Sequence, residues 1–129
     1  MNVIISVKPK YVTAILAGKK EYEYRKSIFK RPVNKIYVYA SSPQKKIVGY
    51  FFYDYFIQGT PEYIWKHTSA VSGISESEFF DYYKRKEVAF ALKIGRFYPF
   101  AVFPDPFALS TNFCAPQSYR YFEKDIANE

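Results

Sequence analysis

The sequence predicts an α+β fold in which a small β-barrel of mixed and antiparallel strands is flanked by two to four helices. Aromatic residues make up 22% of the 129 residues, and flat rings favour the pleated surface of a strand. The apolar run at residues 47–57 is long and contains Gly49, which favours a bend or a point of close backbone approach, and long bent strands suit a barrel. We expect one domain over residues 1–129, of which residues 124–129 can fray.

The N-terminal part of the chain predicts a strand, a helix and a second strand. Residues 3–7 form an apolar run typical of a buried strand, and Pro9 follows where proline opens a helix. Apolar side chains at helical spacing continue this helix to Ala17, and Gly18 suits the left-handed conformation that ends a helix. Residues 21–26 alternate with a period of two, which predicts a strand with three charged side chains on one face.

Two later segments carry the signals of a helix start. Thr60 precedes Pro61, which predicts a helix with a threonine cap that runs towards His67. Ser75 and Glu78 have the spacing of a capping box, in which each side chain bonds the backbone near the other residue. A second short helix is therefore expected after Ser75.

Strand patterns surround these two helices. Residues 35–40 are mostly apolar and end at a serine–serine–proline turn. Residues 88–94 predict another strand, and Gly95 is expected to separate it from a further strand over 97–103. The C-terminal part is rich in Pro, Ser, Thr and Asn. We expect its aromatic segment, 114–122, to wrap around the domain in an ordered way, because rings are costly to leave in water.

The composition argues against several classes of protein and site. No apolar stretch approaches the roughly 20 residues that span a bilayer and no signal-peptide pattern opens the chain, so we expect no membrane partner and a cytoplasmic location. Cys114 is the single cysteine and His67 the single histidine, so we expect no disulfide, metal site or cofactor. We interpret both as structural or surface residues, and Trp65 as part of the core.

Basic residues are concentrated in the first third of the chain. Residues 1–46 carry 11 Lys and Arg against two Glu, a net charge of +9, whereas the remainder carries 8 basic and 10 acidic side chains, a net charge of −2. A basic face of this kind attracts phosphate groups. A solvated surface that keeps the protein soluble explains the same excess, so charge alone leaves both interpretations open.

Four ionisable side chains follow the first predicted helix. Lys19 and Lys20 lie at its C-terminus, and Glu23 and Arg25 share one face of the next strand. Residues two apart on a strand have Cα atoms about 7 Å apart, so Glu23 can orient the Arg25 guanidinium towards a phosphate. An exposed ion pair on a strand edge, worth less than about 1 kcal/mol, is the alternative interpretation.

This segment resembles Gly-x-Lys-x-x-Glu-x-Arg, the signature of ASCH domains, which are relatives of PUA folds. The four fixed positions are occupied by Gly18, Lys20, Glu23 and Arg25. The surrounding order is also similar to the family, with a first strand that ends in residues 8–10 and a later strand closed by residues 39–43. Residues 116–121 are similar to the closing segment of a prokaryotic subgroup. The resemblance covers most of the chain and implies a PUA-like barrel.

The resemblance implies a cleft beside the barrel that binds RNA or nucleotides. Carried over to this sequence, the signature implicates Lys20, Glu23 and Arg25. Our own expectation adds a rim of residues at strand and turn ends, because such ends gather at one mouth of a small barrel. These rim residues are Lys8, Lys10, Ser41, Ser42, Lys45 and Lys46. For each rim lysine, a solvated charge is the alternative interpretation.

Three functions are compatible with these residues. The first is a module that binds RNA or a nucleotide. The second is an enzyme that acts on RNA or a modified nucleoside: some ASCH proteins are ribonucleases, whose reaction needs an acid, a base and a cation rather than a metal. Lys20, Glu23 and a nearby Tyr are the candidates for these roles, with the assignment among them open; Lys20 could act as a base because Lys19, Arg25 and Lys26 add positive charge nearby. Other ASCH proteins hydrolyse acetylated cytosine nucleosides, but they carry a hydroxyl residue where this chain has Glu23, which argues against that reaction. The third is an interaction protein whose basic face meets an acidic partner.

Overall fold

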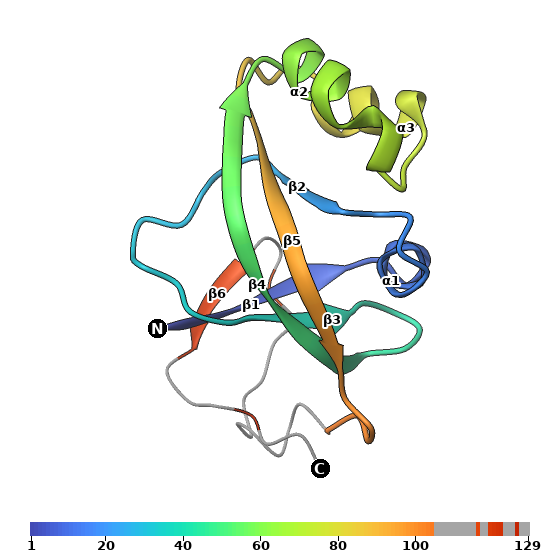
Figure 1. Cartoon of the computed structure of the whole chain (residues 1–129), viewed down its shortest axis with the longest axis vertical. Helices are drawn as coiled ribbons and strands as arrows, with labels where there is room; N and C mark the ends of the chain where they lie inside the picture. Colours follow the sequence, from blue (N-terminus) through green and yellow to red (C-terminus); the bar gives the residue numbers. More distant parts are fainter. Residues whose placement is uncertain (105–115, 117–118, 123–125, 127–129) are drawn as a thin grey trace.

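A computed structural model describes residues 1–104, 116, 119–122 and 126. The described elements, in chain order, are β1 (Asn2–Val7), α1 (Pro9–Leu16), β2 (Tyr22–Arg25), β3 (Ile36–Ala40), β4 (Lys46–Gly59), α2 (Pro61–Thr68), the 3-10 helix η1 (Ser69–Val71), α3 (Glu76–Tyr82), β5 (Ala89–Pro99) and β6 (Tyr119–Phe122). Figure 1 shows α2 and α3 together at one end of the long β4–β5 pair, with α1 further down, beside β2. The fold is α+β, as predicted.

The six strands form one mixed sheet in the order β2-β5-β4-β3-β1-β6. Strands β1 and β3 are parallel, and the other four pairings are antiparallel. Because β2 and β6 are edge strands, the sheet is an open version of the predicted barrel. The loop after β2 bridges the opening: the backbone N–H of Lys30 donates to the Tyr121 hydroxyl at 2.9 Å, and the Phe29 ring lies edge-on to Tyr119, with 4.9 Å between centroids.

Three apolar clusters hold the sheet and helices together. The largest packs α1 against β1, β3, β4 and β5 and includes Ile5 and Phe51. The second surrounds Tyr37 on the opposite face of β1 and β3. The third packs α2 and α3 against β2 and β5 and includes Tyr24 and Phe79. All four residues of β2 are buried as a result, so its charged side chains are held in a low-water environment.

The predicted helix signals have the expected geometry. Helix α1 begins at Pro9, and Gly18 adopts a left-handed φ of 74° just after it. The Thr60 hydroxyl accepts a hydrogen bond from the backbone N–H three residues later, which caps α2. Ser75 caps α3 in the same way, and its hydroxyl donates to the Glu78 carboxylate at 3.1 Å. These contacts confirm both predicted helix starts.

The expectation that Gly95 separates two strands was wrong. Strand β5 runs without interruption from Ala89 to Pro99. A Cβ atom at Gly95 would lie 2.6 Å from the carbonyl oxygen of Phe52, and one at Gly49 would lie 2.4 Å from the carbonyl oxygen of Tyr98. Both glycines therefore allow β4 and β5 to approach closely. This confirms the expected close approach at Gly49 and gives Gly95 the same role.

The C-terminal segment pairs with the N-terminal strand. Strand β6 lies antiparallel to β1, and the buried Ile126 donates its N–H to the Tyr37 hydroxyl at 2.9 Å. Most of the predicted wrap, including Cys114, lies outside the described residues. The same is true of the predicted tail, of which Ile126 alone is described.

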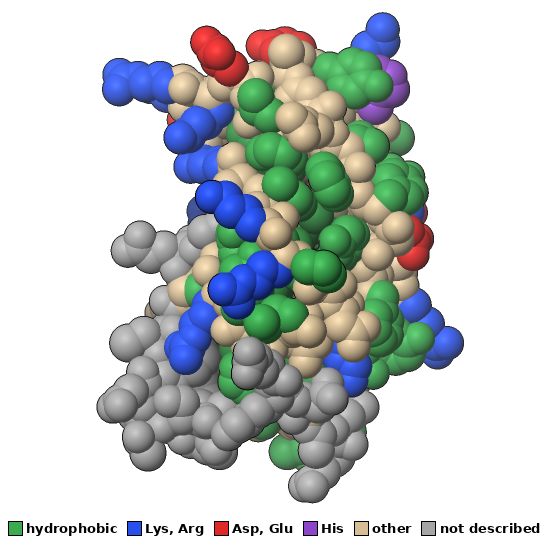
Figure 2. Space-filling model, turned by 90° about the vertical axis from the view of Figure 1, so that its left-hand side faces the viewer, with side chains coloured by type: hydrophobic (Ala, Val, Ile, Leu, Met, Phe, Trp, Pro, Cys, Tyr) green, Lys and Arg blue, Asp and Glu red, His purple; other side chains and the backbone are tan. Residues whose placement is uncertain are grey.

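Cations and apolar side chains share one side of the molecule. Figure 2 views the molecule from the left of Figure 1 and shows Lys and Arg side chains in a column beside a band of hydrophobic side chains. Among the described residues, no helix combines the length and the apolar character needed to cross a membrane.

Candidate functional site

A pocket of about 640 Å³ lies beside the free edge of β2. Its walls come from the end of β1, the start of α1, strand β2 with the two residues after it, and α3. This size is typical of pockets that hold a small ligand. The pocket lies beside β2 because this edge strand has no neighbour on one side, where α1 and α3 face each other instead.

Two signature residues line the pocket. Glu23 and Arg25 are each 6% exposed and contribute to its wall. Both point to the sheet face opposite Tyr22 and Tyr24, whose rings pack under α2 and α3. The alternative of a solvent-exposed ion pair on a strand edge is wrong, because all four residues of β2 are buried. Buried charged side chains are costly, so their presence here calls for a partner or a ligand.

Lys20 lies behind the pocket wall. It is 3% exposed, and its Nζ donates to the carbonyl oxygen of Ser72 at 3.1 Å. The same Nζ lies 4.6 Å from the centre of the Tyr24 ring and 5.3 Å from that of Tyr11, and both of these residues contribute to the pocket wall. Burial lowers the pKa of Lys20, and the negative charge of Glu23 opposes this shift. Lys20 thus supports the two rings from behind.

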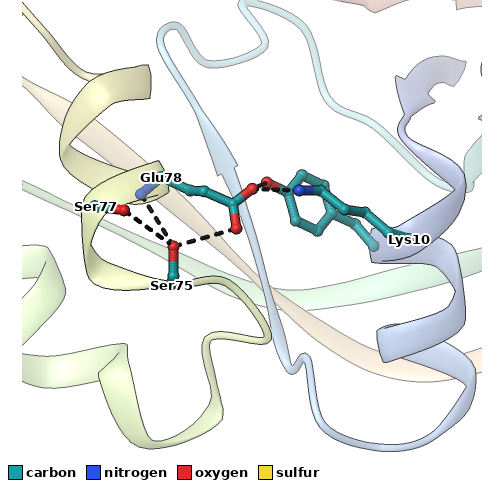
Figure 3. Close-up of polar contacts among 5 residues, drawn as sticks. Lys10, Ser75, Ser77 and Glu78 are labelled. Atoms are coloured by element: carbon teal, nitrogen blue, oxygen red, sulfur yellow. Dashed lines mark hydrogen bonds and ion pairs between the residues drawn. The ribbon is translucent and has the colours of Figure 1, made fainter.

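Glu78 connects α3 to α1 at the pocket (Figure 3). Its carboxylate accepts hydrogen bonds from the Lys10 ammonium, from the Tyr11 hydroxyl at 2.6 Å and from the Ser75 hydroxyl at 3.1 Å. These bonds, with Lys10 the largest contributor, lower the pKa of Glu78 from 4.5 to about 2. Burial and the bond to Glu78 raise the pKa of Tyr11. The bridge holds the two helices at a defined separation across the pocket.

The sequence interpretation missed the contribution of α3. Asp81 and Tyr82 follow Glu78 by three and four positions, so all three share one helix face, and all three line the pocket. Burial raises the pKa of Tyr82, and the Lys26 Nζ lies 4.4 Å from the centre of its ring. The helical spacing of these polar residues was the available signal, but Glu78 was interpreted only as half of a capping box.

Some of the expected rim residues line the pocket and others do not, although the Ser41 N–H donates to the carbonyl oxygen of Val7 in the pocket wall at 3.0 Å. Lys8 lines the pocket, and Lys10 reaches it through Glu78. Four expected rim residues belong to the connection between β3 and β4 or to the first residue of β4, and they are not part of the pocket wall. These are Ser41, Ser42, Lys45 and Lys46. Lys26 and Lys86, which were not predicted, line it instead.

Histidine and possible metal ligands lie elsewhere or are not clustered. The exposed His67 ring contacts the carbonyl oxygen of Tyr63, one helical turn earlier, at 2.8 Å, in keeping with a surface role. Within the described part of the chain, no three His, Cys, Asp or Glu side chains are grouped so that they could hold a metal ion.

The matching family model and one curated relative name the same family, the ASCH domain. The family model "ASCH domain" matches residues 5–95. An "ASCH domain-containing ribonuclease" of Zymomonas mobilis is 28% identical over 129 residues, which cover 95% of this chain and 84% of that protein. The "large ribosomal subunit protein uL22" of Ureaplasma parvum is 33% identical over 92 residues, which cover 70% of this chain and 30% of that protein.

Solved structures give the same answer. The crystal structure of ASCH from Zymomonas mobilis superposes with a TM-score of 0.87 at 28% identity and covers 95% of this chain and 88% of that one. A tyrosine-to-phenylalanine variant of the same protein gives a TM-score of 0.85 at 26% identity, covering 95% and 91% of the two chains. Because the family model matches well over half of the residues and the fold agrees over nearly all of them, this chain belongs to the ASCH domain family.

Proposed function

We propose that this chain binds RNA by holding one nucleotide in the pocket beside β2. The observation that carries the proposal is the pairing of buried Glu23 and Arg25 with lysines and tyrosine rings around one pocket of about 640 Å³. The cations that line it are Lys8, Arg25, Lys26 and Lys86, against the carboxylates Glu23, Glu78 and Asp81. Since Lys10 neutralises Glu78 from outside the wall, the pocket carries an excess of positive charge.

The lining suits the parts of a nucleotide. Guanidinium and ammonium groups bind phosphate oxygens through charge-assisted hydrogen bonds, and the presence of Arg25 and Lys86 in the pocket wall supports this role. Aromatic faces stack on bases with little dependence on sequence, and the presence of Tyr82 and Tyr11 in the same wall supports that role. Membership of the ASCH family and similarity to a protein named a ribonuclease support RNA as the ligand.

Salt-dependent binding tests this proposal. We expect a fluorescently labelled RNA to bind, with an affinity that falls as salt rises, and Lys86→Gln to reduce the logarithmic salt slope by about 0.7, the value for one lost phosphate contact on a single strand. Fluorescence anisotropy at several salt concentrations measures both. Lys66→Gln, an exposed lysine on α2, is the matched control. Absence of RNA binding by the wild-type protein at low salt would contradict the proposal.

Cleavage of the bound RNA is a second candidate function, favoured by the carboxylates that line the same pocket as the cations. We propose that Glu23 accepts the proton of a ribose 2′-OH, whose oxygen attacks the adjacent phosphorus. The bond from phosphorus to the 5′-oxygen breaks, an ammonium at the rim such as Lys26 donates a proton to that oxygen, and a 2′,3′-cyclic phosphate forms. Arg25 stabilises the charge that develops on the phosphoryl oxygens.

Product analysis tests the second candidate. Mass spectrometry of an RNA oligomer after incubation should detect a 2′,3′-cyclic phosphate, and Glu23→Gln should slow its formation by about 10²- to 10⁴-fold, the contribution typical of a general base. Glu62→Gln, in the exposed first turn of α2, is the control, and thermal melting checks that Glu23→Gln folds. If the RNA binds but stays intact, the cleavage function is ruled out and only the binding function remains.

A further inference from the structure

Two phenylalanine rings lie on the same sheet face as the signature residues. In the β2–β5 register Arg25 is opposite Phe90 and Glu23 is opposite Leu92. In the β4–β5 register Leu92 is opposite Phe56. Residues opposite each other in antiparallel strands point to the same face. The rings of Phe56 and Phe90, whose centroids are 6.3 Å apart, therefore extend the face of Glu23 and Arg25 across two further strands.

This pair of rings is partly open to solvent. Phe56 is 40% exposed, Phe90 is half-buried, and Val88, which precedes β5, is 41% exposed. Neither Phe56 nor Phe90 belongs to any of the three core clusters formed by the described residues. Removing apolar surface from water is favourable, so the exposed part of the rings gains from a ligand that covers it. We call Phe56, Phe90 and Val88 the aromatic shelf.

Cations lie on the two loops next to the aromatic shelf. Lys26, directly after β2, and Lys84, Arg85 and Lys86, in the loop before β5, are exposed. Further along the loop after β2, the Lys30 backbone and the Arg31 guanidinium contact Tyr121 of β6 instead. The two loops start from adjacent strands, because Arg25 pairs with Phe90. Lys26 and Lys86 also line the pocket, so the basic loops are continuous with it.

The charges select the kind of ligand that fits the shelf. Next to the shelf, the four cations Lys26, Lys84, Arg85 and Lys86 stand against the single carboxylate of Glu87, so the partner is a polyanion. Open rings next to cations suit a polyanion that carries flat apolar groups, which describes single-stranded RNA. An acidic protein segment would satisfy the cations without using the rings.

We propose that the aromatic shelf binds the bases of single-stranded RNA on one side of the nucleotide that occupies the pocket, with the two basic loops contacting the intervening phosphates. This inference rests on the proposed RNA-binding function and extends it: the ligand is a strand of several nucleotides, and the pocket binds only one of them. The shelf therefore increases the affinity for an RNA strand relative to a single nucleotide.

Binding measurements with a short and a long ligand distinguish the contribution of the shelf from that of the pocket. The probes are adenosine monophosphate, followed by NMR, and a fluorescent 2′-O-methyl RNA of about ten nucleotides, within the range that one small β-barrel covers. The methylated 2′-oxygen prevents cleavage. Phe56→Gln should weaken binding of the oligomer by about five-fold or more, the loss of one stacked base, and leave binding of the mononucleotide unchanged.

Phe52→Gln is the matched control. Phe52 is on the same strand and is 38% exposed, but it contacts Tyr50 and Tyr98 on the opposite face of the sheet. Unchanged oligomer binding by Phe56→Gln, or an equal loss in Phe52→Gln, would overturn the shelf while the pocket still binds the mononucleotide. Failure of the wild-type protein to bind either probe would overturn the proposed function, and the shelf with it.

Discussion

Lys20 shows how a charged residue can serve a site without lining it. Its amine is out of contact with bulk water, held by the Ser72 carbonyl and the faces of two tyrosine rings. The rings of Tyr11 and Tyr24 form the pocket wall, so the position of Lys20 fixes the shape of that wall. The desolvation that lowers the pKa of Lys20 is the cost of this arrangement.

The lowered pKa of Glu78 predicts how the stability of the folded protein responds to acid. Its pKa is about 2 in the folded protein against 4.5 for an ordinary glutamate, so the unfolded state binds a proton first as pH falls. The stability that Glu78 contributes is therefore complete above about pH 5 and is lost as pH falls towards 2. In Glu78→Gln this part of the acid destabilisation should be absent, which urea unfolding at pH 6, 4 and 3 measures.

Glu76→Gln provides the comparison for that experiment. Glu76 lies in the same first turn of α3, so both substitutions remove a carboxylate near the same helix end. If the free energy of unfolding of Glu76→Gln and Glu78→Gln changes in parallel with pH, the bridge to Lys10 and Tyr11 is not the cause of the acid response.

At the scale of elements, the connection between η1 and α3 depends on Gly73. This residue has a φ of 63°, and a Cβ atom there would lie 2.4 Å from the Lys20 Cβ. Gly18 has a φ of 74°, but nothing lies within 4 Å of its Cβ position. Gly18→Ala should cost about 1–2 kcal/mol from backbone strain alone. Gly73→Ala should cost about 1–3 kcal/mol more from the added clash, measured by urea unfolding.

An equal cost for the two alanine substitutions would contradict the close packing of η1 on Lys20. Because both positions have left-handed backbone, the difference between the two variants removes the conformational part and leaves the clash. A larger loss of RNA binding in Gly73→Ala than in Gly18→Ala would accompany the displacement of Lys20.

Elements with local signals could be predicted, and those defined by distant partners could not. The starts of α2 and α3 were predictable because Thr60 and Ser75 bond their own first turns. Gly95 was misinterpreted because its reason is the Phe52 carbonyl on another strand. Strand β6 was expected only as an ordered segment, since its partner β1 is at the other end of the sequence.

The residues of the candidate site also fall into those with a local sequence signal and those defined by distant partners. The positions of Glu23 and Arg25 followed from the signature and its alternation on a strand. The spacing of Glu78, Asp81 and Tyr82 indicated a polar face on α3, but which element this face meets depends on the packing of α3 beside β2, which lies far away in the sequence. The turn after β3 was expected at the rim because strand ends gather in a small barrel, and Ser41 does bond Val7 of the pocket wall, but the side chains of this turn are not part of the wall.

For the whole molecule, one hydroxyl joins the two edges of the open sheet. The Tyr121 hydroxyl on β6 accepts the N–H of Lys30 in the loop after β2. Tyr121→Phe removes a hydrogen bond worth about 1 kcal/mol, so this loop should open about five times more often. Limited trypsin digestion should then cleave after Lys30 faster than in the wild type.

Tyr98→Phe is the control for this digestion, because it removes a hydroxyl from β5. An unchanged rate of cleavage after Lys30 in Tyr121→Phe would show that the Phe29–Tyr119 ring contact is sufficient to hold the loop.

The place of β1 between β3 and β6 has a consequence for synthesis on the ribosome. Tyr121 follows its partner Val3 by 118 positions, whereas Ile36 follows it by 33. One side of β1 can therefore pair early, and the other stays unpaired until residues 119–122 have emerged. During that interval an apolar strand presents an open edge to neighbouring nascent chains, which is a recognised route to misassembly. Chaperone contact with this protein should accordingly be concentrated late in its translation.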